Sequence, residues 1–286
     1  MVVNFIFILK AIIIGVVEGI TEFLPVSSTG HMIIIGNLIG FKEGILPKTL
    51  YSKSYIDMFN MVIQLGAILA IIFLYWGKIT DTFKDFWPTK PKSGFMFWFK
   101  IGIACIPAGV LGILFNDKIE EKLFYPMPVI AALIVGALWM IFAEKKYRRN
   151  FKTKSIDDIT IKQAFVIGCF QCLALWPGMS RSASTIIGGW ISGLSTIAAA
   201  EFSFFVAIPV MVGVTIISLS KHLVAVNAIQ IIALAVGFIV SFIVALVVVD
   251  KFISFLKKRP MRVFAMYRIF VGILLLVLVF TNVVKF

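Results

Sequence analysis

The chain has 286 residues, of which 60% are hydrophobic and only 14% are charged, and its mean hydropathy is +1.03. This composition excludes an ordinary soluble domain, and the continuous rather than alternating apolar runs exclude a transmembrane β-barrel. The net charge of +13 does not indicate nucleic-acid binding, because basic residues of membrane proteins collect in cytoplasmic loops beside anionic headgroups.

Six segments are apolar and approach the roughly 20 residues that a bilayer-spanning helix needs. They form two groups of three, separated by a basic, polar linker at 144–161. A shorter apolar segment precedes each group and breaks at a proline into a run of hydroxyl residues. We therefore expect an all-α polytopic membrane protein with six transmembrane helices and two broken segments. The expected spans lie at about 57–76, 95–115, 126–143, 200–220, 229–249 and 263–282.

The two halves of the chain, residues 1–143 and 162–286, resemble each other weakly. An offset of 153 residues pairs Glu18 with Gln171, and it pairs Ser27 with Ser180. Weak similarity between halves is typical of the internal repeats found in transporter-like membrane proteins.

Lys and Arg residues are concentrated in three of the connecting stretches. Seven, six and five lie in 144–162, 250–268 and 77–100, whereas three, two and one lie in 41–56, 116–125 and 221–228. The positive-inside rule places the first three stretches in the cytoplasm and the other three outside. The two groups of spans then run in opposite directions, as an inverted-topology repeat requires.

This orientation makes each broken segment a re-entrant hairpin. Residues 1–41 would enter from outside and return there, and residues 162–198 would do the same from the cytoplasm. Non-helical backbone at membrane depth is tolerated only when it is buried in protein or lines a wet cavity, so we expect the two tips to meet. Alternatively, residues 2–20 are long enough to span the membrane if Lys10 is tolerated.

Two carboxylates precede the first break. Glu18 and Glu22 are four residues apart, so they share one face of a helix, and only Lys10 is near them in sequence. Adjacent carboxylates at membrane depth are hard to keep ionised without a cation, and Mg²⁺ and Ca²⁺ favour such oxygen ligands. We expect metal or proton handling here; the alternative is an ordinary ion pair within a packed interface.

A polar run, Ser27-Ser28-Thr29-Gly30-His31, follows Pro25 at the first break. Hydroxyls and backbone amides in such a turn bind phosphate, although the same residues would also cap a helix over 32–40. Both roles can hold, because a helix N-terminus is itself an anion site. His31 is a candidate nucleophile or general acid–base, with a structural histidine as the alternative.

The second break carries a single basic residue, Arg181. Its planar guanidinium suits a phosphate group, although an ion pair with Glu18 or Glu22 would equally explain it. Gln64 and Glu201 lie within apolar spans and are assigned supporting roles. The expected phosphate-binding residues around Arg181 are Gly178, Ser180, Ser182 and Thr185.

The segment Glu18-Gly-Ile-Thr-Glu22-Phe-Leu-Pro-Val-Ser27-Ser28-Thr29-Gly30-His31 closely resembles the first signature of the undecaprenyl-pyrophosphate phosphatase family, also called the bacitracin-resistance family. Pro177-Gly-Met-Ser180-Arg181-Ser182-Ala-Ser184-Thr185 resembles its second signature, and the resemblance extends to Glu201-Phe-Ser-Phe. It implies a bacterial inner-membrane enzyme that needs a divalent metal and hydrolyses undecaprenyl pyrophosphate, recycling the lipid carrier for peptidoglycan. It also implies bacitracin resistance.

The resemblance carries several roles to this chain. Glu18 and Glu22 match the acidic motif, and Ser28 and His31 match the proposed nucleophile and base positions. Ser180, Arg181 and Thr185 match the pyrophosphate-binding positions. The resemblance leaves open whether Ser28, His31 or a water attacks phosphorus. A homodimer is also possible on the sequence alone.

We expect a site that opens to the outer face of the membrane. The rival interpretation is a polyprenyl-phosphate transporter or flippase, because broken helices at the membrane midplane suit alternating access. A third interpretation, a purely structural membrane protein, predicts that no intramembrane polar residue matters.

Overall fold

The computed structural model describes residues 2–41, 53–88, 92–222 and 226–284, and these form helices without a β-strand. Seven helices among these residues are long and apolar enough to cross a membrane, so the chain is a multi-pass membrane protein. In chain order the helices are α1 (Val2–Thr21), α2 (Ser28–Leu38), α3 (Lys53–Leu74), α4 (Trp76–Lys84), α5 (Gly94–Leu123), α6 (Pro126–Tyr147), η1 (Ile156–Asp158), α7 (Ile161–Gln171), η2 (Cys172–Leu175), α8 (Arg181–Ile191), α9 (Thr196–His222), α10 (Ala228–Lys258) and α11 (Arg262–Phe280).

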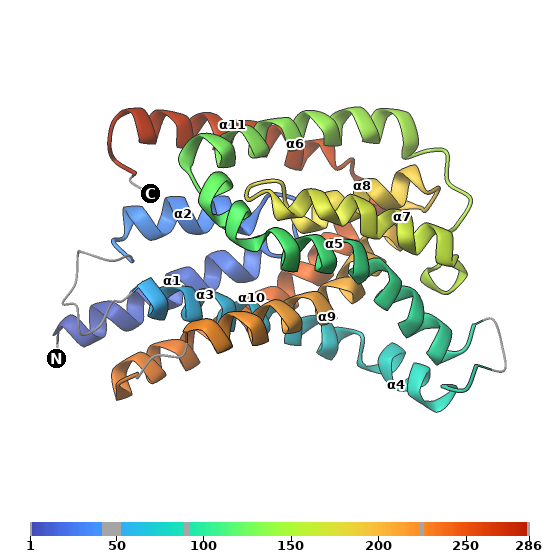
Figure 1. The fold of residues 1–286 in the computed structure, drawn as a ribbon, viewed down its shortest axis with the longest axis horizontal. Helices are drawn as coiled ribbons and strands as arrows, with labels where there is room; N and C mark the ends of the chain where they lie inside the picture. Colours follow the sequence, from blue (N-terminus) through green and yellow to red (C-terminus); the bar gives the residue numbers. More distant parts are fainter. Residues whose placement is uncertain (1, 42–52, 89–91, 223–225, 285–286) are drawn as a thin grey trace.

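Each of the six predicted spans coincides with one long helix, in order α3, α5, α6, α9, α10 and α11. Five of these helices are longer than predicted, most of all α5 with 30 residues and α10 with 31. Figure 1 shows α5 bending along its length, and Pro107 lies within it, where the ring removes a backbone hydrogen bond. The sequence predicts no helix at α4, most of which lies in the basic stretch 77–100.

The seventh apolar helix is α1, whose window Asn4–Thr21 is long enough to span by length alone. Figure 1 shows, however, that α1 runs only to the middle of the molecule, where the chain turns and α2 returns to the same end. Helices α7 and α8 form a similar pair that enters from the opposite end. Both breaks therefore lie near the centre, as expected of two re-entrant tips; the inverted repeat itself stays a prediction.

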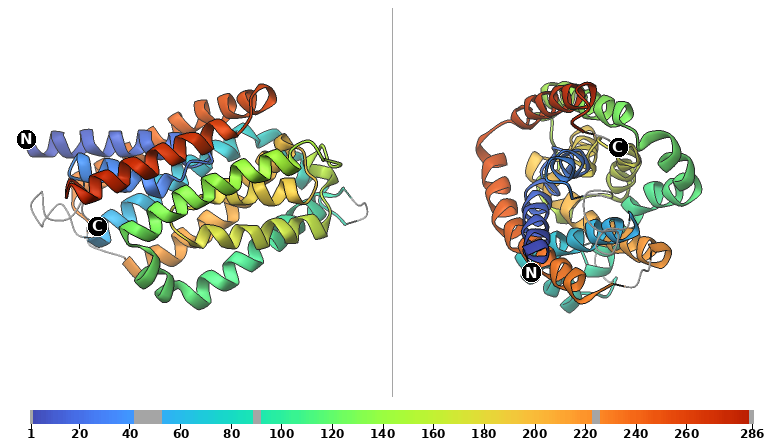
Figure 2. Two further views of the ribbon diagram at one scale, coloured as in Figure 1. Left: turned by 90° about the horizontal axis from the view of Figure 1, so that it is seen from above. Right: turned by 90° about the vertical axis from the view of Figure 1, so that its left-hand side faces the viewer.

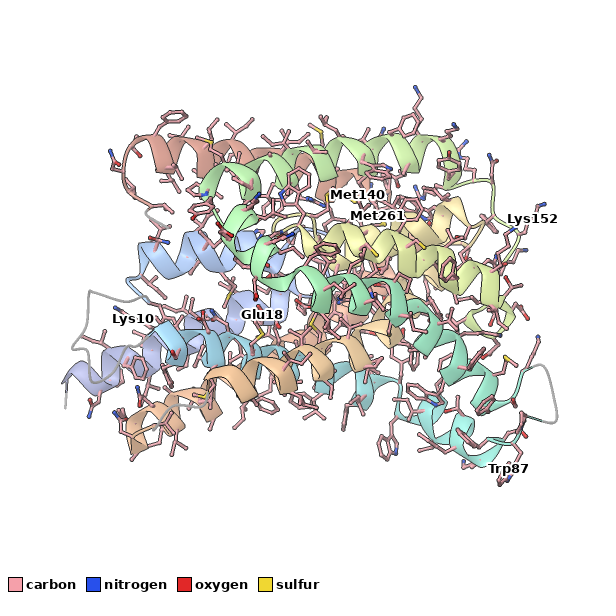
Figure 3. The ribbon with its side chains drawn as sticks, in the orientation of Figure 1. Lys10, Glu18, Trp87, Met140, Lys152 and Met261 are labelled. Atoms are coloured by element: carbon pink, nitrogen blue, oxygen red, sulfur yellow. The ribbon has the colours of Figure 1, made fainter. Side chains whose placement is uncertain are left out.

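The ends of the molecule differ in the residues that they present. Figure 3 places Lys152 and Trp87 at one end, Lys10 towards the other, and Glu18 between them. The basic linker and the α4 region thus share the end from which α7 enters. Of the connections expected at the opposite end, much of 41–56 and part of 221–228 lie outside the described residues.

Helices α6 and α11 lie side by side along one edge of the bundle (Figures 1 and 2). The buried carboxylate of Glu144 joins them, because it accepts hydrogen bonds of 2.7 Å from the backbone N–H groups of Met261 and Arg262. Such a carboxylate caps the first turn of α11 and complements its dipole. Arg148 lies 3.3 Å from the same carboxylate. This contact fixes where α11 begins and hence which of its residues face the two breaks.

Candidate active site

A cavity of about 120 Å³ lies between the two breaks. Most of its lining is polar, although the surrounding protein is apolar. Seven of its lining residues are ones that the sequence predicted to be catalytic or to bind phosphate: Glu22, Ser27, Ser28, Thr29, Gly178, Ser180 and Arg181. The other four are Gln64, Ala174, Pro177 and Met211. Residues more than 150 positions apart therefore meet in one cavity, which is the contact between tips that the sequence led us to expect.

Two helices begin at this cavity. Ser27 caps α2, where its side chain accepts from the N–H of Gly30 at 3.4 Å, and Ser180 caps α8 through the N–H of Ala183 at 3.3 Å. Both serines have φ of 72°, a backbone state that costs a non-glycine residue about 1–2 kcal/mol. The N-terminus of a helix attracts anions through its free N–H groups and its dipole. Two such ends make the cavity a site for a negatively charged group.

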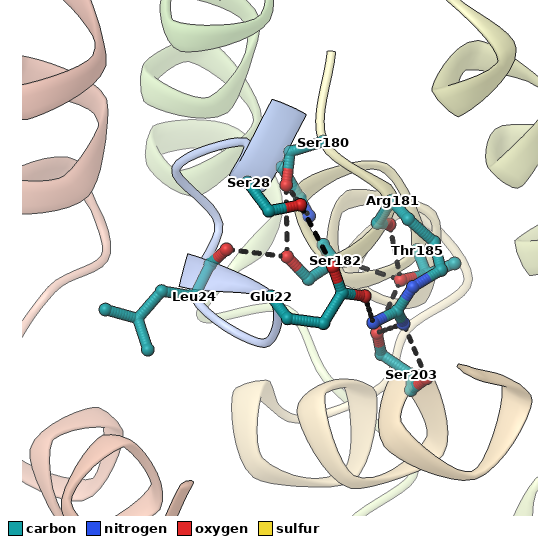
Figure 4. A network of polar contacts seen from close by, with 9 residues as sticks. Glu22, Leu24, Ser28, Ser180, Arg181, Ser182, Thr185 and Ser203 are labelled. Atoms are coloured by element: carbon teal, nitrogen blue, oxygen red, sulfur yellow. Dashed lines mark hydrogen bonds and ion pairs between the residues drawn. The ribbon is translucent and has the colours of Figure 1, made fainter. Parts of the chain in front are cut away.

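Glu22 lies at the centre of the polar contacts shown in Figure 4. Its Oε1 accepts from Nη2 of Arg181 at 3.1 Å, and its Oε2 accepts from the hydroxyl of Ser28 at 3.0 Å. The ion pair that the sequence offered as an alternative is thus present. It does not preclude phosphate binding, because Nε of Arg181 is buried without a partner and remains free to donate.

Arg181 is held from its other side by a residue that the sequence analysis did not single out. Its Nη1 donates to the backbone oxygen of Ser203 at 3.0 Å and lies 3.3 Å from Oγ of the same residue. The hydroxyl of Thr185 also contacts Ser203 Oγ, at 2.7 Å. Ser203 is fully buried in α9. The one signal that could have found it was its place in the Glu201-Phe-Ser-Phe segment.

The remaining predicted phosphate ligands do not line the cavity. Ser182 donates to the backbone oxygen of Leu24 at 2.9 Å, which ties the second break to the first (Figure 4), and it lies 3.0 Å from Oγ of Ser180. Thr185 bonds back to the carbonyl of Arg181 at 2.9 Å. Both residues therefore hold the cavity walls in place rather than face the cavity.

Glu18 is buried beside Glu22 but does not line the cavity. Glu18 is 1% exposed, and its Oε1 has no hydrogen-bond partner. The neighbouring charged side chain is the carboxylate of Glu22. Lys10, the one cation near it in sequence, donates instead to the backbone oxygen of Gly40 at 3.2 Å. An unpartnered carboxyl oxygen next to a second carboxylate can coordinate a cation or accept a proton.

His31 also lies outside the cavity lining. Its Nδ1 lies 2.8 Å from the backbone oxygen of Ser27, and its Nε2 lies 2.8 Å from the hydroxyl of Tyr267 in α11. The two rings stack at 5.5 Å between centroids. The imidazole thus connects the start of α2 to α11.

Arg268 corrects the sequence analysis, which counted it among the cations of a cytoplasmic loop. It lies inside α11, is fully buried, and donates through Nη2 to the backbone oxygens of Gly178 at 3.0 Å and Ala132 at 3.1 Å. Residue 268 belongs both to the basic stretch 250–268 and to the span predicted at 263–282. That overlap was the one sign in the sequence that Arg268 lies within the membrane.

No group of three or more His, Cys, Asp or Glu side chains comes together in the part of the chain that the structure describes. Among the side chains that line the cavity, Glu22, Ser28 and Gln64 offer oxygen atoms that suit a cation, and the unpartnered Oε1 of Glu18 lies outside the lining. Mg²⁺ typically takes one or two carboxylates and completes its shell with waters and phosphate oxygens. The donor set fits a divalent cation that is shared with a phosphorylated ligand.

Fold and site together define a class: an all-helical, multi-pass membrane protein with a largely polar cavity at the meeting point of two broken helix pairs. The chain belongs to the bacitracin resistance protein BacA family, which it matches over residues 11–274. It is 69% identical to the undecaprenyl-diphosphatase of Clostridium novyi (strain NT), covering 99% of each chain. It is 59% identical to undecaprenyl-diphosphatase 2 of Clostridium acetobutylicum, covering all of both chains. The undecaprenyl-diphosphatase of Clostridium tetani is 52% identical over 97% of this chain and 98% of its own.

Proposed function

We propose that this protein is an integral-membrane phosphatase that hydrolyses undecaprenyl pyrophosphate to undecaprenyl phosphate and inorganic phosphate. This activity recycles a lipid carrier for peptidoglycan synthesis and makes cells resistant to bacitracin when the enzyme is abundant. The names of its relatives support the substrate. The observation that carries the reaction type is a single buried cavity where Glu22, Ser28 and Arg181 meet at two helix N-termini.

The cavity's own residues bind and orient the pyrophosphate. The free N–H groups at the starts of α2 and α8 face its negative oxygens, and the hydroxyls of Ser27, Thr29 and Ser180 add donors. Nε of Arg181 supplies a charged donor once the guanidinium moves towards the phosphate. A small cavity holds the headgroup, while the prenyl chain stays in the apolar surroundings.

Glu22 takes the proton in the chemical step. The attacking oxygen belongs to Ser28 or to a water in its place, and its proton passes to Oε2 of Glu22, which lies 3.0 Å from the Ser28 hydroxyl. The new P–O bond forms at the terminal phosphorus while the anhydride P–O bond breaks, and the electron pair leaves with undecaprenyl phosphate. If Ser28 attacks, a water then hydrolyses the phosphoserine. Arg181 stabilises the charge that develops on phosphorus-bound oxygens.

Glu22 and Glu18 would hold the divalent cation, Mg²⁺ or Ca²⁺, with Ser28 and Gln64 as further oxygen donors. When bound, the cation would neutralise charge on the phosphate oxygens and so favour attack on phosphorus. Removing it with a chelator should abolish phosphate release from the wild-type protein, and adding Mg²⁺ or Ca²⁺ should restore it. Full activity in excess chelator would rule the cation out.

The site opens to the outer face of the bacterial inner membrane in this proposal. The first break supplies Glu22, Ser27, Ser28 and Thr29, and its helices come from the end opposite the basic linker. Since basic linkers remain in the cytoplasm, that end faces outwards. Labelling Thr29→Cys with an impermeant thiol reagent from either side of sealed vesicles tests this, after the three native cysteines are removed.

The test of the proposed function is phosphate release from undecaprenyl pyrophosphate by the purified protein in detergent. Wild type should release phosphate, whereas Glu22→Gln and Arg181→Met should not. Ser241→Ala is the control, because Ser241 is a buried polar residue of α10 whose hydroxyl has no partner and which does not line the cavity. If wild type releases no phosphate but moves polyprenyl phosphate across proteoliposomes, the transporter interpretation replaces this one.

A further inference from the structure

Two consecutive residues of α11 reach the two breaks separately. The hydroxyl of Tyr267 lies 2.8 Å from Nε2 of His31, in the first turn of α2 after the first break. Nη2 of Arg268 lies 3.0 Å from the backbone oxygen of Gly178, at the second break. His31 also contacts the backbone oxygen of Ser27. Ser27 and Gly178 both line the cavity. One turn of α11 is therefore in contact with both walls of the site without lining it.

Arg268 is a cation whose charge no partner offsets. Its side chain is fully buried, and its Nε and Nη1 have no hydrogen-bond partner. None of the ion pairs between described residues includes it, and its two acceptors are neutral backbone oxygens. Burying an unpaired charge at membrane depth is costly, so such a residue indicates a functional role.

Two glycines, Gly136 and Gly178, lie next to the guanidinium of Arg268. A Cβ on Gly136 of α6 would lie 2.3 Å from Nη2 of Arg268, so a larger residue there would displace the guanidinium. Gly178 has φ of +98°, and a Cβ on it would lie 2.5 Å from the carbonyl of Val129. The carbonyl that Arg268 binds thus belongs to a residue whose conformation suits glycine alone. Arg268 holds the second break in that conformation.

We infer that Tyr267 and Arg268 are positioning residues, which hold the two breaks in register and make the cavity positive for a pyrophosphate group. This inference rests on the proposed function, since the anion that offsets the charge of Arg268 is the substrate's own pyrophosphate. Tyr267 acts by orienting His31, and Arg268 acts by fixing Gly178 and by its charge. Neither residue lines the cavity, so both act through groups that do.

The variants Arg268→Met, Arg268→Lys and Tyr267→Phe separate this role from a structural one. Arg268→Met keeps the length of the side chain but removes its charge; it should raise KM about tenfold or more and weaken binding of inorganic pyrophosphate equally. Its melting temperature should stay the same or rise, because replacing an unpaired buried charge with an apolar group removes a cost. Arg268→Lys should recover part of the KM, and Tyr267→Phe should lower kcat by a few fold with KM unchanged.

Arg148→Met is the control, because Arg148 at the end of α6 also donates to a backbone oxygen of a neighbouring segment, that of Arg259 at the end of α10, but it lies beside Glu144 and outside the cavity lining. It should keep wild-type KM. Unchanged pyrophosphate binding in Arg268→Met, or a loss of activity that only follows a fall in melting temperature, would overturn the inference. If wild type binds pyrophosphate without releasing phosphate, the proposed function fails, and the binding comparison still tests Arg268.

Discussion

The two breaks at the centre of the molecule share a backbone and differ in their side chains. Each begins an 11-residue helix after a capping serine with φ of 72°. The 153-residue offset that pairs these serines also pairs Ser28 with Arg181. The same backbone conformation thus places a helix N-terminus, which attracts anions, at each break. The side chains differ: the first break carries the hydroxyl of Ser28 beside the carboxylate of Glu22, and the second carries the cation Arg181. Neither break contains a complete site.

The largest effect should come from breaking the ion pair between the walls. Arg181→Met removes the charged donor, and we expect kcat/KM for phosphate release to fall about 10³-fold, the upper range for losing one such donor. It also leaves Glu22 buried and unpaired, which costs roughly 3–5 kcal/mol of stability. Kinetics and thermal unfolding in the same detergent measure both effects.

The double variant Glu22→Gln with Arg181→Met distinguishes the two effects. It leaves no unpaired charge where the ion pair stood, so its stability should return towards that of wild type, while its activity should be no higher than that of Arg181→Met. Recovery of activity together with stability would show that the pair only holds the breaks together.

The next effect should arise within the first wall alone. Ser28→Ala removes the hydroxyl that donates to Glu22, and we expect the rate of phosphate release to fall about 10²-fold, as for loss of a general-base contact. Thr29→Ala is its matched control, since Thr29 lines the same cavity one residue later; it should lose less than tenfold. Equal losses of activity in Ser28→Ala and Thr29→Ala in steady-state assays would contradict the proposed role of Ser28 in the chemical step.

A smaller effect should come from the direct link between the breaks. Ser182→Ala removes the hydrogen bond to the backbone oxygen of Leu24 and should cost about 1 kcal/mol with a few-fold loss of activity. Ser184→Ala is the control, because its hydroxyl bonds only back to Ser180 within α8, at 2.8 Å. If both variants lose the same activity, the link to the first break does not matter for the site.

The smallest effect tests whether the two backbones are equivalent. Ser27→Gly and Ser180→Gly each relieve a positive φ but lose a cap, so their stabilities should change by less than about 1 kcal/mol and by similar amounts. Thermal unfolding of both variants makes the comparison. A loss of several kcal/mol in only one would mean that the breaks are not held alike.

Much of this arrangement could be predicted from sequence, because its signals are local. Apolar runs gave the six long helices, and proline followed by hydroxyl residues marked both breaks. The expectation that the tips meet followed from the cost of exposed backbone in a bilayer. Seven of the predicted site residues indeed line one cavity.

The remaining features depend on contacts between distant residues, which one sequence does not reveal. The sequence offered an ion pair of Arg181 with Glu18 or Glu22 only as an alternative, and the structure is needed to show that the partner is Glu22, 159 positions away. Ser203, Tyr267 and Arg268 lie in apolar helices, where nothing local shows that they face the breaks. Arg268 could have been recognised by its place inside a predicted span.

The most direct test of the account is a structure of the protein with inorganic pyrophosphate and Mg²⁺ bound. The account predicts density in the cavity that contacts Ser28 at the first break and Arg181 at the second break at once. Density held by only one break, or at another place in the molecule, would contradict it.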